Sequence, residues 1–239
     1  MNTIQFDKGD VRVVAHRGLS GLERENTNAA FVAAGNRSYY GIETDIHRTA
    51  DGRFVVNHDA TLSRVAGENI PVEEVTLATL QGVVLFDTDG SKDRADLRPC
   101  SLENYISICK KYEKHCILEL KSDFTEEETE RFIRIIERLG YLEQVTFISF
   151  HYDNLVKVRR LLPHQSVQFL FSEVTEQIIE RLIADGIDAD VYFRALSEQT
   201  VKTLHAAGRT INCWTVDAKE DAERLVAMGV DYITTNILE

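Results

Sequence analysis

The feature that most constrains the fold of this chain is the alternation of short β-rich runs with amphipathic helical stretches. Strands that alternate with helices in this way are typical of a parallel sheet with helical crossovers. The runs that we interpret as strands cover residues 11–15, 40–45, 116–120, 145–150, 166–171, 189–193, 210–214 and 232–235. Eight such strands predict an α/β fold of the closed (β/α)8 barrel type (a TIM barrel), whose active site lies at the carboxyl ends of the strands.

Several of the intervening helices have recognisable ends. Thr125 followed by Glu128 forms a capping-box pattern at the start of one helix. Asp217 followed by Glu220 predicts the same device at the start of another, and Gly229 predicts where that helix ends. These boundary signals support the interpretation of the segments between the strands as helices.

The alternation is interrupted after the second strand. No helix follows Asp45; residues 49–52 read as a turn and residues 54–56 as a further strand. A hairpin centred on that turn pairs residues whose numbers sum to about 101, so His58 is expected opposite Glu43. The hairpin would rise above the barrel mouth and return to it.

A polar stretch then separates this hairpin from the remaining strands. Residues 60–99 are expected to form an irregular insertion at the catalytic face, which makes them a natural lid or specificity element. Apart from that insertion, residues 1–239 are expected to form a single barrel domain. We therefore expect the functional site to lie in the barrel mouth, beside the insertion.

Charge and composition restrict the partners of the chain. A formal net charge of −12 disfavours binding to nucleic acid and to anionic lipid surfaces. No apolar run approaches the roughly 18 residues of a spanning helix, and residues 1–10 do not resemble a signal peptide. The four cysteines show no Cys-x-x-Cys spacing, which favours reduced thiols in a cytoplasmic protein. We expect a small-molecule partner, without stable membrane insertion; the oligomeric state stays open.

Acidic residues gather on two neighbouring predicted strands. Glu43 and Asp45 stand two residues apart, so both side chains face the same way, and Glu119 and Lys121 repeat the spacing on the next strand. Two like charges at about 4 Å repel by about 4 kcal/mol when the effective dielectric constant is about 20, so the carboxylates must share a proton or a cation. Oxygen ligands of this kind suit Mg²⁺ or Ca²⁺. Structural ion pairs are the alternative interpretation.

Two histidines are expected beside these acids. His16 directly follows the first strand, where barrel enzymes carry functional groups, and His58 follows the hairpin, with Asp59 as an orienting acid. Imidazole can both take and give a proton near neutral pH. Arg17 offers a planar fork for phosphate oxygens, and Gly18 allows a sharp turn. A single histidine would more often be structural, but two near one acidic cluster favour acid–base chemistry.

An ordered set of short motifs gives these positions a family context. The chain resembles the glycerophosphodiester phosphodiesterase family in nearly its whole length, with the stretch after Ala60 as the weak part. The motifs are Ala15-His16-Arg17-Gly18, Glu25-Asn26-Thr27, Gly41-Ile42-Glu43-Thr44-Asp45-Ile46, Thr49-Ala50-Asp51-Gly52, Val55-Val56-Asn57-His58-Asp59, Leu118-Glu119-Leu120-Lys121, Ile148-Ser149-Phe150, Asn212-Cys213-Trp214-Thr215 and Gly229-Val230-Asp231-Tyr232-Ile233-Thr234. Any one of them is unremarkable, but the ordered set is specific.

The resemblance implies a fold, a reaction and a set of roles. It implies a distorted barrel that hydrolyses glycerophosphodiesters to glycerol phosphate and an alcohol. One divalent cation, Mg²⁺ or Ca²⁺ with Mn²⁺ as a further candidate, would be held by the three acids Glu43, Asp45 and Glu119, and His16 and His58 would be the acid–base pair. Arg17 and Lys121 would neutralise the phosphate, and Trp214 would line the pocket. Which histidine is the base and which the acid stays open, although we assign His16 as the base.

Two aspects of the sequence leave the substrate open. Arg24 stands where the family usually has proline before Glu-Asn-Thr, which bears on the choice of substrate. Phe150, like Trp214, is a candidate substrate contact beside its simpler interpretation as a packing residue. One alternative is a lysophospholipase D-like activity on lysolipids. The other is a barrel that binds phosphodiesters without catalysis, which would be expected to lack one of the ligands or histidines.

Overall fold

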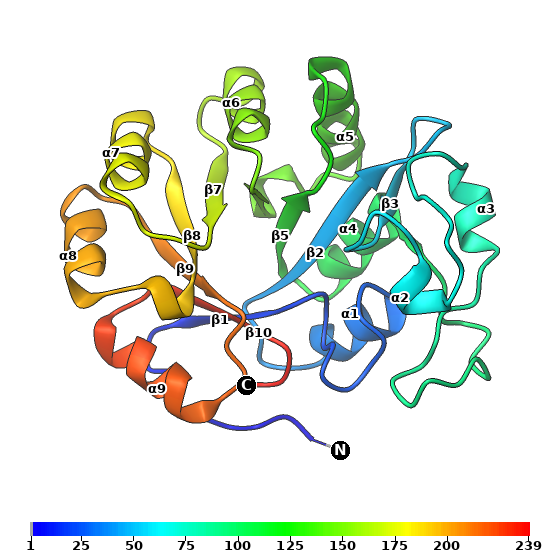
Figure 1. Cartoon of the computed structure of the whole chain (residues 1–239), viewed down its shortest axis with the longest axis horizontal. Coiled ribbons are helices and arrows are strands. Elements are labelled where there is room, and N and C mark those ends of the chain that lie inside the picture. The colour runs from blue at the N-terminus through cyan, green and yellow to red at the C-terminus, as the bar shows by residue number, and fades with distance from the viewer. Residues whose placement is uncertain (1) are drawn as a thin grey trace.

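Eight parallel strands close into a barrel in the computed structural model, which describes residues 2–239 (Figure 1). The barrel strands are β1 (Arg12–Ala15), β2 (Gly41–Arg48), β5 (His115–Leu120), β6 (Val145–Ser149), β7 (Ser166–Phe171), β8 (Asp188–Tyr192), β9 (Ile211–Trp214) and β10 (Tyr232–Thr235). Their order around the barrel is β1-β10-β9-β8-β7-β6-β5-β2, and a parallel pairing of β1 with β2 closes the ring. The predicted barrel is confirmed, and β7 and β10 have the predicted bounds.

Helices cover the outside of this barrel (Figure 1). They are α1 (Asn28–Gly35), α4 (Leu102–Lys111), α5 (Glu126–Arg138), α6 (Tyr152–Leu161), α7 (Glu176–Asp185), α8 (Glu198–Ala206) and α9 (Lys219–Met228), with short 3-10 turns at η1 (Leu142–Gln144) and η2 (Phe193–Ala195). Among the residues that the structure describes, every helix is too short or too polar to cross a lipid bilayer.

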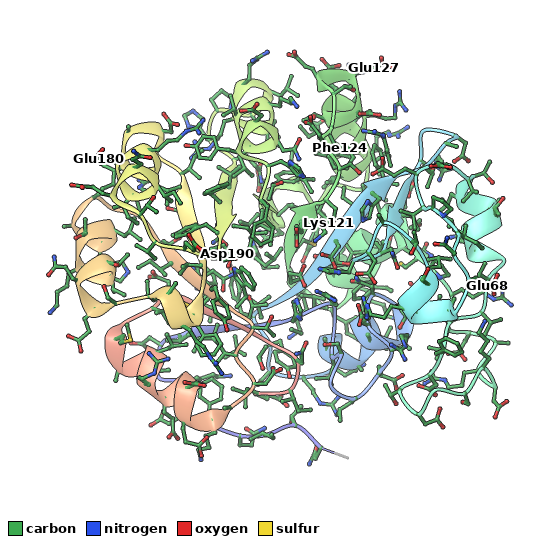
Figure 2. The ribbon with its side chains drawn as sticks, in the orientation of Figure 1. Glu68, Lys121, Phe124, Glu127, Glu180 and Asp190 are labelled. Atoms are coloured by element: carbon green, nitrogen blue, oxygen red, sulfur yellow. The ribbon has the colours of Figure 1, made fainter. Side chains whose placement is uncertain are left out.

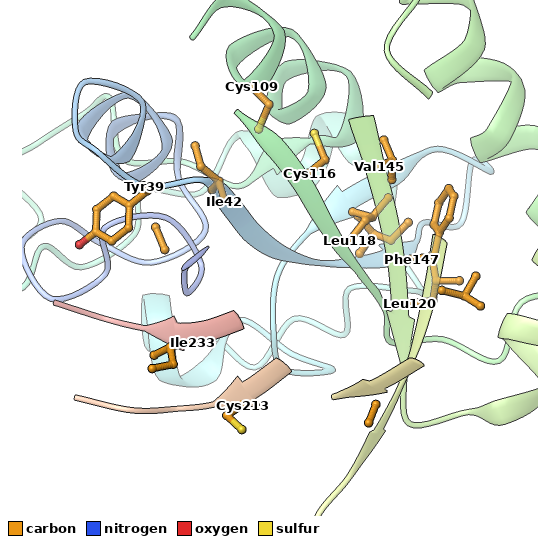
Figure 3. Close-up of a cluster of buried hydrophobic side chains, with 14 of the residues drawn as sticks. Tyr39, Ile42, Cys109, Cys116, Leu118, Leu120, Val145, Phe147, Cys213 and Ile233 are labelled. Carbon is orange, nitrogen blue, oxygen red and sulfur yellow. The ribbon is translucent and has the colours of Figure 1, made fainter. Parts of the chain in front are cut away.

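The core follows the alternation of side chains along each strand. Leu118 and Phe147 point outward into the main hydrophobic cluster between strands and helices (Figure 3). Their neighbours Ile117 and Ile148 point inward and pack with Val14 in the barrel interior. All four cysteines are buried and free. The strands therefore bury both faces, as parallel sheets do.

One of the two predicted helix starts is confirmed and the other is wrong. Thr125 and Glu128 form the predicted capping box, with hydrogen bonds of 2.8 and 3.2 Å in the two directions. At α9, however, the N-cap is Ala218 and makes no side-chain bond. The carboxylate of Asp217 instead accepts hydrogen bonds from Thr235 and from Asn236, because these groups at the end of β10 offer it three donors. Gly229 ends the helix as predicted, in the left-handed conformation.

The hairpin after β2 forms, but its register differs from the prediction. β3 (Phe54–Val56) runs antiparallel to β2, and Ile46 pairs with Val56, so partner numbers sum to 102 and not 101. The reason is the length of the turn. The backbone N–H of Thr49 donates to the carbonyl of Arg53, which leaves a loop of three residues, whereas the predicted register requires a loop of two. Continued pairing would place His58 opposite Thr44. The expected pairing of His58 with Glu43 is therefore wrong.

The segment between β3 and β4 (Cys100–Ser101) is more ordered than predicted. It contains α2 (Ser63–Ala66) and α3 (Leu77–Gln81), and it lies beside β3 at the edge of the barrel (Figure 1). Its leucines and valines form a second hydrophobic cluster around Val55 of β3, so the expectation of an irregular polar insertion is wrong in this respect. Arg24, the departure from the family pattern, donates hydrogen bonds to the carbonyls of Phe86 and Asp87 and anchors this segment.

Candidate active site

A pocket of about 100 Å³ at the barrel mouth brings the predicted residues together. Five of the residues predicted from the sequence for catalysis, metal binding or phosphate binding line it: His16, Arg17, Glu43, His58 and Glu119. Phe150 and Trp214 line it as well. Asp45 and Lys121 contact this set from β2 and the end of β5. The pocket lies where the strands end, as a barrel site should.

His58 reaches the pocket by a route that strand pairing does not predict. β3 ends at Val56, and the chain bends at residues 58–60. Because the strand conformation is lost there, the imidazole is not held to the alternation of sides that would have turned it away from Glu43. The imidazole of His47 donates a hydrogen bond to the carbonyl of His58 at 3.3 Å and holds this bend.

Three buried carboxylates form the centre of the site. Asp45 of β2 is paired with Glu119 of β5 in the sheet register, and Glu43 stands two residues earlier on β2. One oxygen from each residue lies within 4.8 Å of the others. The Oδ1 atom of Asp45 is buried and has no hydrogen-bond partner. A set of hard oxygen donors with one of them unpaired fits a divalent cation such as Mg²⁺ or Ca²⁺.

The pKa values within this trio diverge. Burial, together with the charge of Asp45, raises the pKa of Glu43 well above its usual value and that of Glu119 to about 8. Burial acts in the same direction on Asp45, but Arg17 and Lys121 outweigh it and lower its pKa. Three negative charges on these carboxylates are therefore unfavourable without a counter-charge. A bound cation would reduce the repulsion between them.

Two positively charged side chains, those of Lys121 and Arg17, flank the three carboxylates. Lys121 Nζ lies 3.0 Å from Glu119 Oε1 and 3.8 Å from Asp45 Oδ1. Arg17 Nε lies 3.5 Å from Asp45 Oδ2, and the Arg17 backbone N–H donates to Glu43 at 2.8 Å. That N–H points at Glu43 because the chain turns sharply here: Arg17 and Gly18 both have positive φ, and a Cβ at residue 18 would lie 2.7 Å from the backbone of α1. Glycine is required at this turn, as the sequence predicted.

His16 is held in one orientation by residues that the sequence did not single out. Its Nδ1 atom lies 2.8 Å from the side-chain oxygen of Asn236, whose amide donates to Asp217 at 2.6 Å. Since that oxygen only accepts, Nδ1 carries the proton, and Nε2, 3.9 Å from Glu43 Oε2, is left as the basic nitrogen. Burial, with the charge of Arg17, lowers the pKa of His16 to about 4. The imidazole is therefore neutral at pH 7 and able to accept a proton.

His58 has its own set of partners. Its Nδ1 atom lies 2.7 Å from Asp59, and Arg64 of α2 bonds the other oxygen of that carboxylate at 2.7 Å. Arg64 also bonds both oxygens of Glu25, which in turn accepts from Arg17 at 2.9 Å. One residue of the inserted segment thus joins the supports of His58 and of Arg17. Burial, in spite of the nearby charge of Asp45, lowers the pKa of His58.

The sequence did not reveal the residues that orient the site by hydrogen bonds to the predicted side chains or to their partners. Asn26 donates to Asp45 at 2.8 Å and accepts from Thr44, while Asn236 and Arg64 support the two histidines. Asn26 belongs to one of the motifs noted above and was carried there without a role. The only signal for Asn236 was its position directly after the last strand, and nothing in the sequence distinguishes Arg64 from a surface arginine.

Aromatic side chains form one wall of the pocket. The ring of Phe150 meets that of Trp214 edge to face, with centroids 5.6 Å apart, and the ring of Tyr192 also contacts the indole, at the same centroid distance. The indole N–H of Trp214 donates to the carbonyl of Asp190 at 3.2 Å. Phe150 lines the pocket and is 44% exposed, so part of its ring is open to solvent.

Comparisons with known proteins identify a family and similar folds. The model of the glycerophosphoryl diester phosphodiesterase family matches residues 16–239. A glycerophosphodiester phosphodiesterase from Caldanaerobacter subterraneus subsp. tengcongensis is 30% identical, over 94% of this chain and 93% of that protein. The structure of an Oleispira antarctica phosphodiesterase in complex with its product sn-glycerol-3-phosphate superposes with a TM-score of 0.87 at 26% identity, over 94% of this chain and 92% of that one. The structure of a glycerophosphodiester phosphodiesterase from Parabacteroides distasonis superposes with a TM-score of 0.81 at 28% sequence identity. The match covers 96% of this chain and 94% of that one.

Proposed function

The chain belongs to the glycerophosphoryl diester phosphodiesterase family, a family of phosphoric diester hydrolases, and from this premise we propose that it hydrolyses glycerophosphodiesters to glycerol phosphate and an alcohol. The observation that carries the proposal is the meeting of two histidines with a buried trio of carboxylates in one small pocket. The Oleispira antarctica relative, with glycerol phosphate as product, supports the same reaction class.

Glu43, Asp45 and Glu119 would hold one divalent cation, for which Mg²⁺, Ca²⁺ and Mn²⁺ are the candidates. Their oxygens are hard donors, and the unpaired Oδ1 atom of Asp45 supports a role as ligand. Such a cation, when bound, withdraws charge from a phosphate oxygen and lowers the pKa of a coordinated hydroxyl.

The protein's own residues supply the proton transfers. His16, neutral and oriented by Asn236, takes the proton of the attacking hydroxyl, which belongs to water or to the substrate's vicinal alcohol. His58, oriented by Asp59, gives a proton to the oxygen of the leaving alcohol as its bond to phosphorus breaks. If the vicinal alcohol attacks, a second step with water follows and the histidines exchange roles.

The remaining polar and aromatic residues bind the substrate. Arg17 and Lys121 neutralise the negative charge that the phosphate gains in the transition state. Phe150 and Trp214 form an apolar wall against the organic part of the substrate. Residues 60–99 would be an insertion within a single barrel domain. This insertion would contribute to the site through Arg64, which binds the carboxylates of Asp59 and Glu25.

Turnover of a substrate panel tests the reaction. We expect the purified protein, with Mg²⁺, Ca²⁺ or Mn²⁺, to release choline and glycerol phosphate from glycerophosphocholine faster than choline from lysophosphatidylcholine, because the pocket is small. Enzymatic choline determination and mass spectrometry of the phosphate product measure both. Faster turnover of the lysolipid would favour the lysophospholipase D-like alternative. Binding of glycerophosphocholine without any release over hours would indicate a non-catalytic barrel.

Replacement of Asn236 by alanine tests how His16 is oriented. We expect kcat to fall about 10- to 100-fold, as is typical when a hydrogen bond that orients a site residue is removed, with little change in KM, because Asn236 does not line the pocket. Steady-state kinetics with glycerophosphocholine separate the two constants. The matched control is Asn104→Ala on the exposed face of α4. A rise in KM with unchanged kcat would contradict an orienting role.

A further inference from the structure

Asp190 of β8 is a pocket residue to which neither the reaction nor the metal site gives a role. Its side chain lines the pocket, yet the residue is only 1% exposed, and its Oδ1 atom is buried without a hydrogen-bond partner. A buried polar atom left unpaired is unfavourable, so one that faces a ligand pocket calls for a partner. Among the described residues, the carboxylates that gather as a metal site are Glu43, Asp45 and Glu119, without Asp190.

The position of Asp190 in the barrel places it across from the acidic trio. In the ring of eight strands, β8 is the fourth strand from β2 in either direction, and β2 carries Glu43 and Asp45. Figure 2 labels Asp190 beside β8 and Lys121 beside β5, on different sides of the barrel centre. A substrate whose phosphate lies at the acids would therefore extend its organic part toward Asp190.

The surroundings of Asp190 favour the neutral form of its carboxyl group. Burial raises its pKa well above the usual value, against the opposing effect of the Asn212 amide. Asn212 is itself occupied, since it accepts from Thr234 at 3.0 Å and lies 3.5 Å from Gln168. A neutral carboxylic acid has an O–H to donate and a carbonyl oxygen to accept, which is the complement of an alcohol.

We propose that Asp190 is a specificity-determining residue that binds the terminal hydroxyl of the substrate's glycerol group, the hydroxyl farthest from phosphorus. The proposal rests on the function proposed above. Because β8 lies across the barrel from the acids of β2, Asp190 would face the hydroxyl that is farthest from a phosphate held at those acids. Ile148, Leu170 and Trp214 make the neighbouring surface largely apolar, so a hydroxyl that enters there needs this partner.

A truncated substrate tests the assignment. 2-Hydroxyethyl phosphocholine keeps the vicinal hydroxyl and the choline of glycerophosphocholine but lacks the terminal hydroxymethyl group. We expect the wild-type protein to prefer glycerophosphocholine in kcat/KM by about 10- to 100-fold, the range for one buried hydrogen bond. Asp190→Ala should lose that factor on glycerophosphocholine and change by less than about 3-fold on the truncated substrate, so the preference disappears.

Conservative and control variants separate recognition from folding. Asp190→Asn keeps a donor and an acceptor in the same shape and should retain most of the preference. Asp188→Ala, two residues earlier on β8 and outside the pocket, should leave the preference unchanged. An equal loss on both substrates with Asp190→Ala, accompanied by a lower Tm, would mean a structural role only and would overturn the proposal.

Two further outcomes are distinguishable. If Asp190 contacted the leaving alcohol instead, Asp190→Ala would spare glycerophosphocholine, whose choline has no second hydroxyl, and would slow glycerophosphoglycerol alone; that result also overturns the proposal. If wild-type protein releases choline from neither phosphocholine substrate, the proposed function fails and the role of Asp190 fails with it, whereas turnover by the wild type without any preference overturns the role of Asp190 alone.

Discussion

Replacement of His16 by alanine is expected to lower kcat for glycerophosphocholine at least 100-fold, and replacement of His58 to do the same. General acid or base catalysis contributes about 10²- to 10⁴-fold, and each imidazole in the pocket has a partner that orients it for this task. KM should change much less, because in the proposed mechanism the phosphate is bound mainly by Arg17, Lys121 and the cation at the acidic trio. Steady-state kinetics at saturating metal measure both constants.

The histidine variants have a matched control in His164→Ala, on an exposed turn after α6. Thermal unfolding should show all three variants folded, since neither pocket histidine belongs to the hydrophobic clusters. The double variant His16→Ala/His58→Ala should be little slower than the worse single one, because residues that act as a unit are not additive. Near-normal turnover in both single variants would end the acid–base assignment.

Removal of divalent cations by EDTA is expected to abolish turnover, and Mg²⁺, Ca²⁺ or Mn²⁺ to restore it. The same cations should stabilise the folded protein, because in the proposed site they would bind buried carboxylates that otherwise repel each other. At 100 times the dissociation constant the stabilisation is about 2.7 kcal/mol. For a chain of this size that corresponds to a rise in Tm of roughly 5–10 °C.

The increase in Tm can be assigned to the acidic trio by substitution. Asp45→Asn should remove most of the metal-dependent increase and most of the activity, because Asp45 has the oxygen left without a hydrogen-bond partner. Asp123→Asn, whose carboxylate is exposed and pairs only with Lys157, should behave like the wild-type protein. Turnover that is indifferent to EDTA, with no Tm response to any of the three cations, would rule out the metal role.

The register of the hairpin between β2 and β3 could not be predicted from the pattern of residues alone. The turn and β3 were predicted with correct bounds, but the register was wrong by one residue, because it depends on whether the loop holds two or three residues. His58 nevertheless enters the pocket, since the chain leaves the strand conformation after Val56. Asp217 was likewise read as a local helix cap. Donors at the end of β10, eighteen or more residues away, bind it instead.

By itself, the sequence determined the barrel, the strand ends and the identity of the acids and histidines at them, because side-chain alternation and helix periodicity are local and repeat along the chain. Only the tertiary structure decided which polar side chains support those residues and which lie on the opposite side of the barrel. Asn236 behind His16, Arg64 between Glu25 and Asp59, and Asp190 opposite β2 are all set by contacts between distant segments. Barrel closure brings such segments together, and no short-range pattern records which polar side chain then finds which partner.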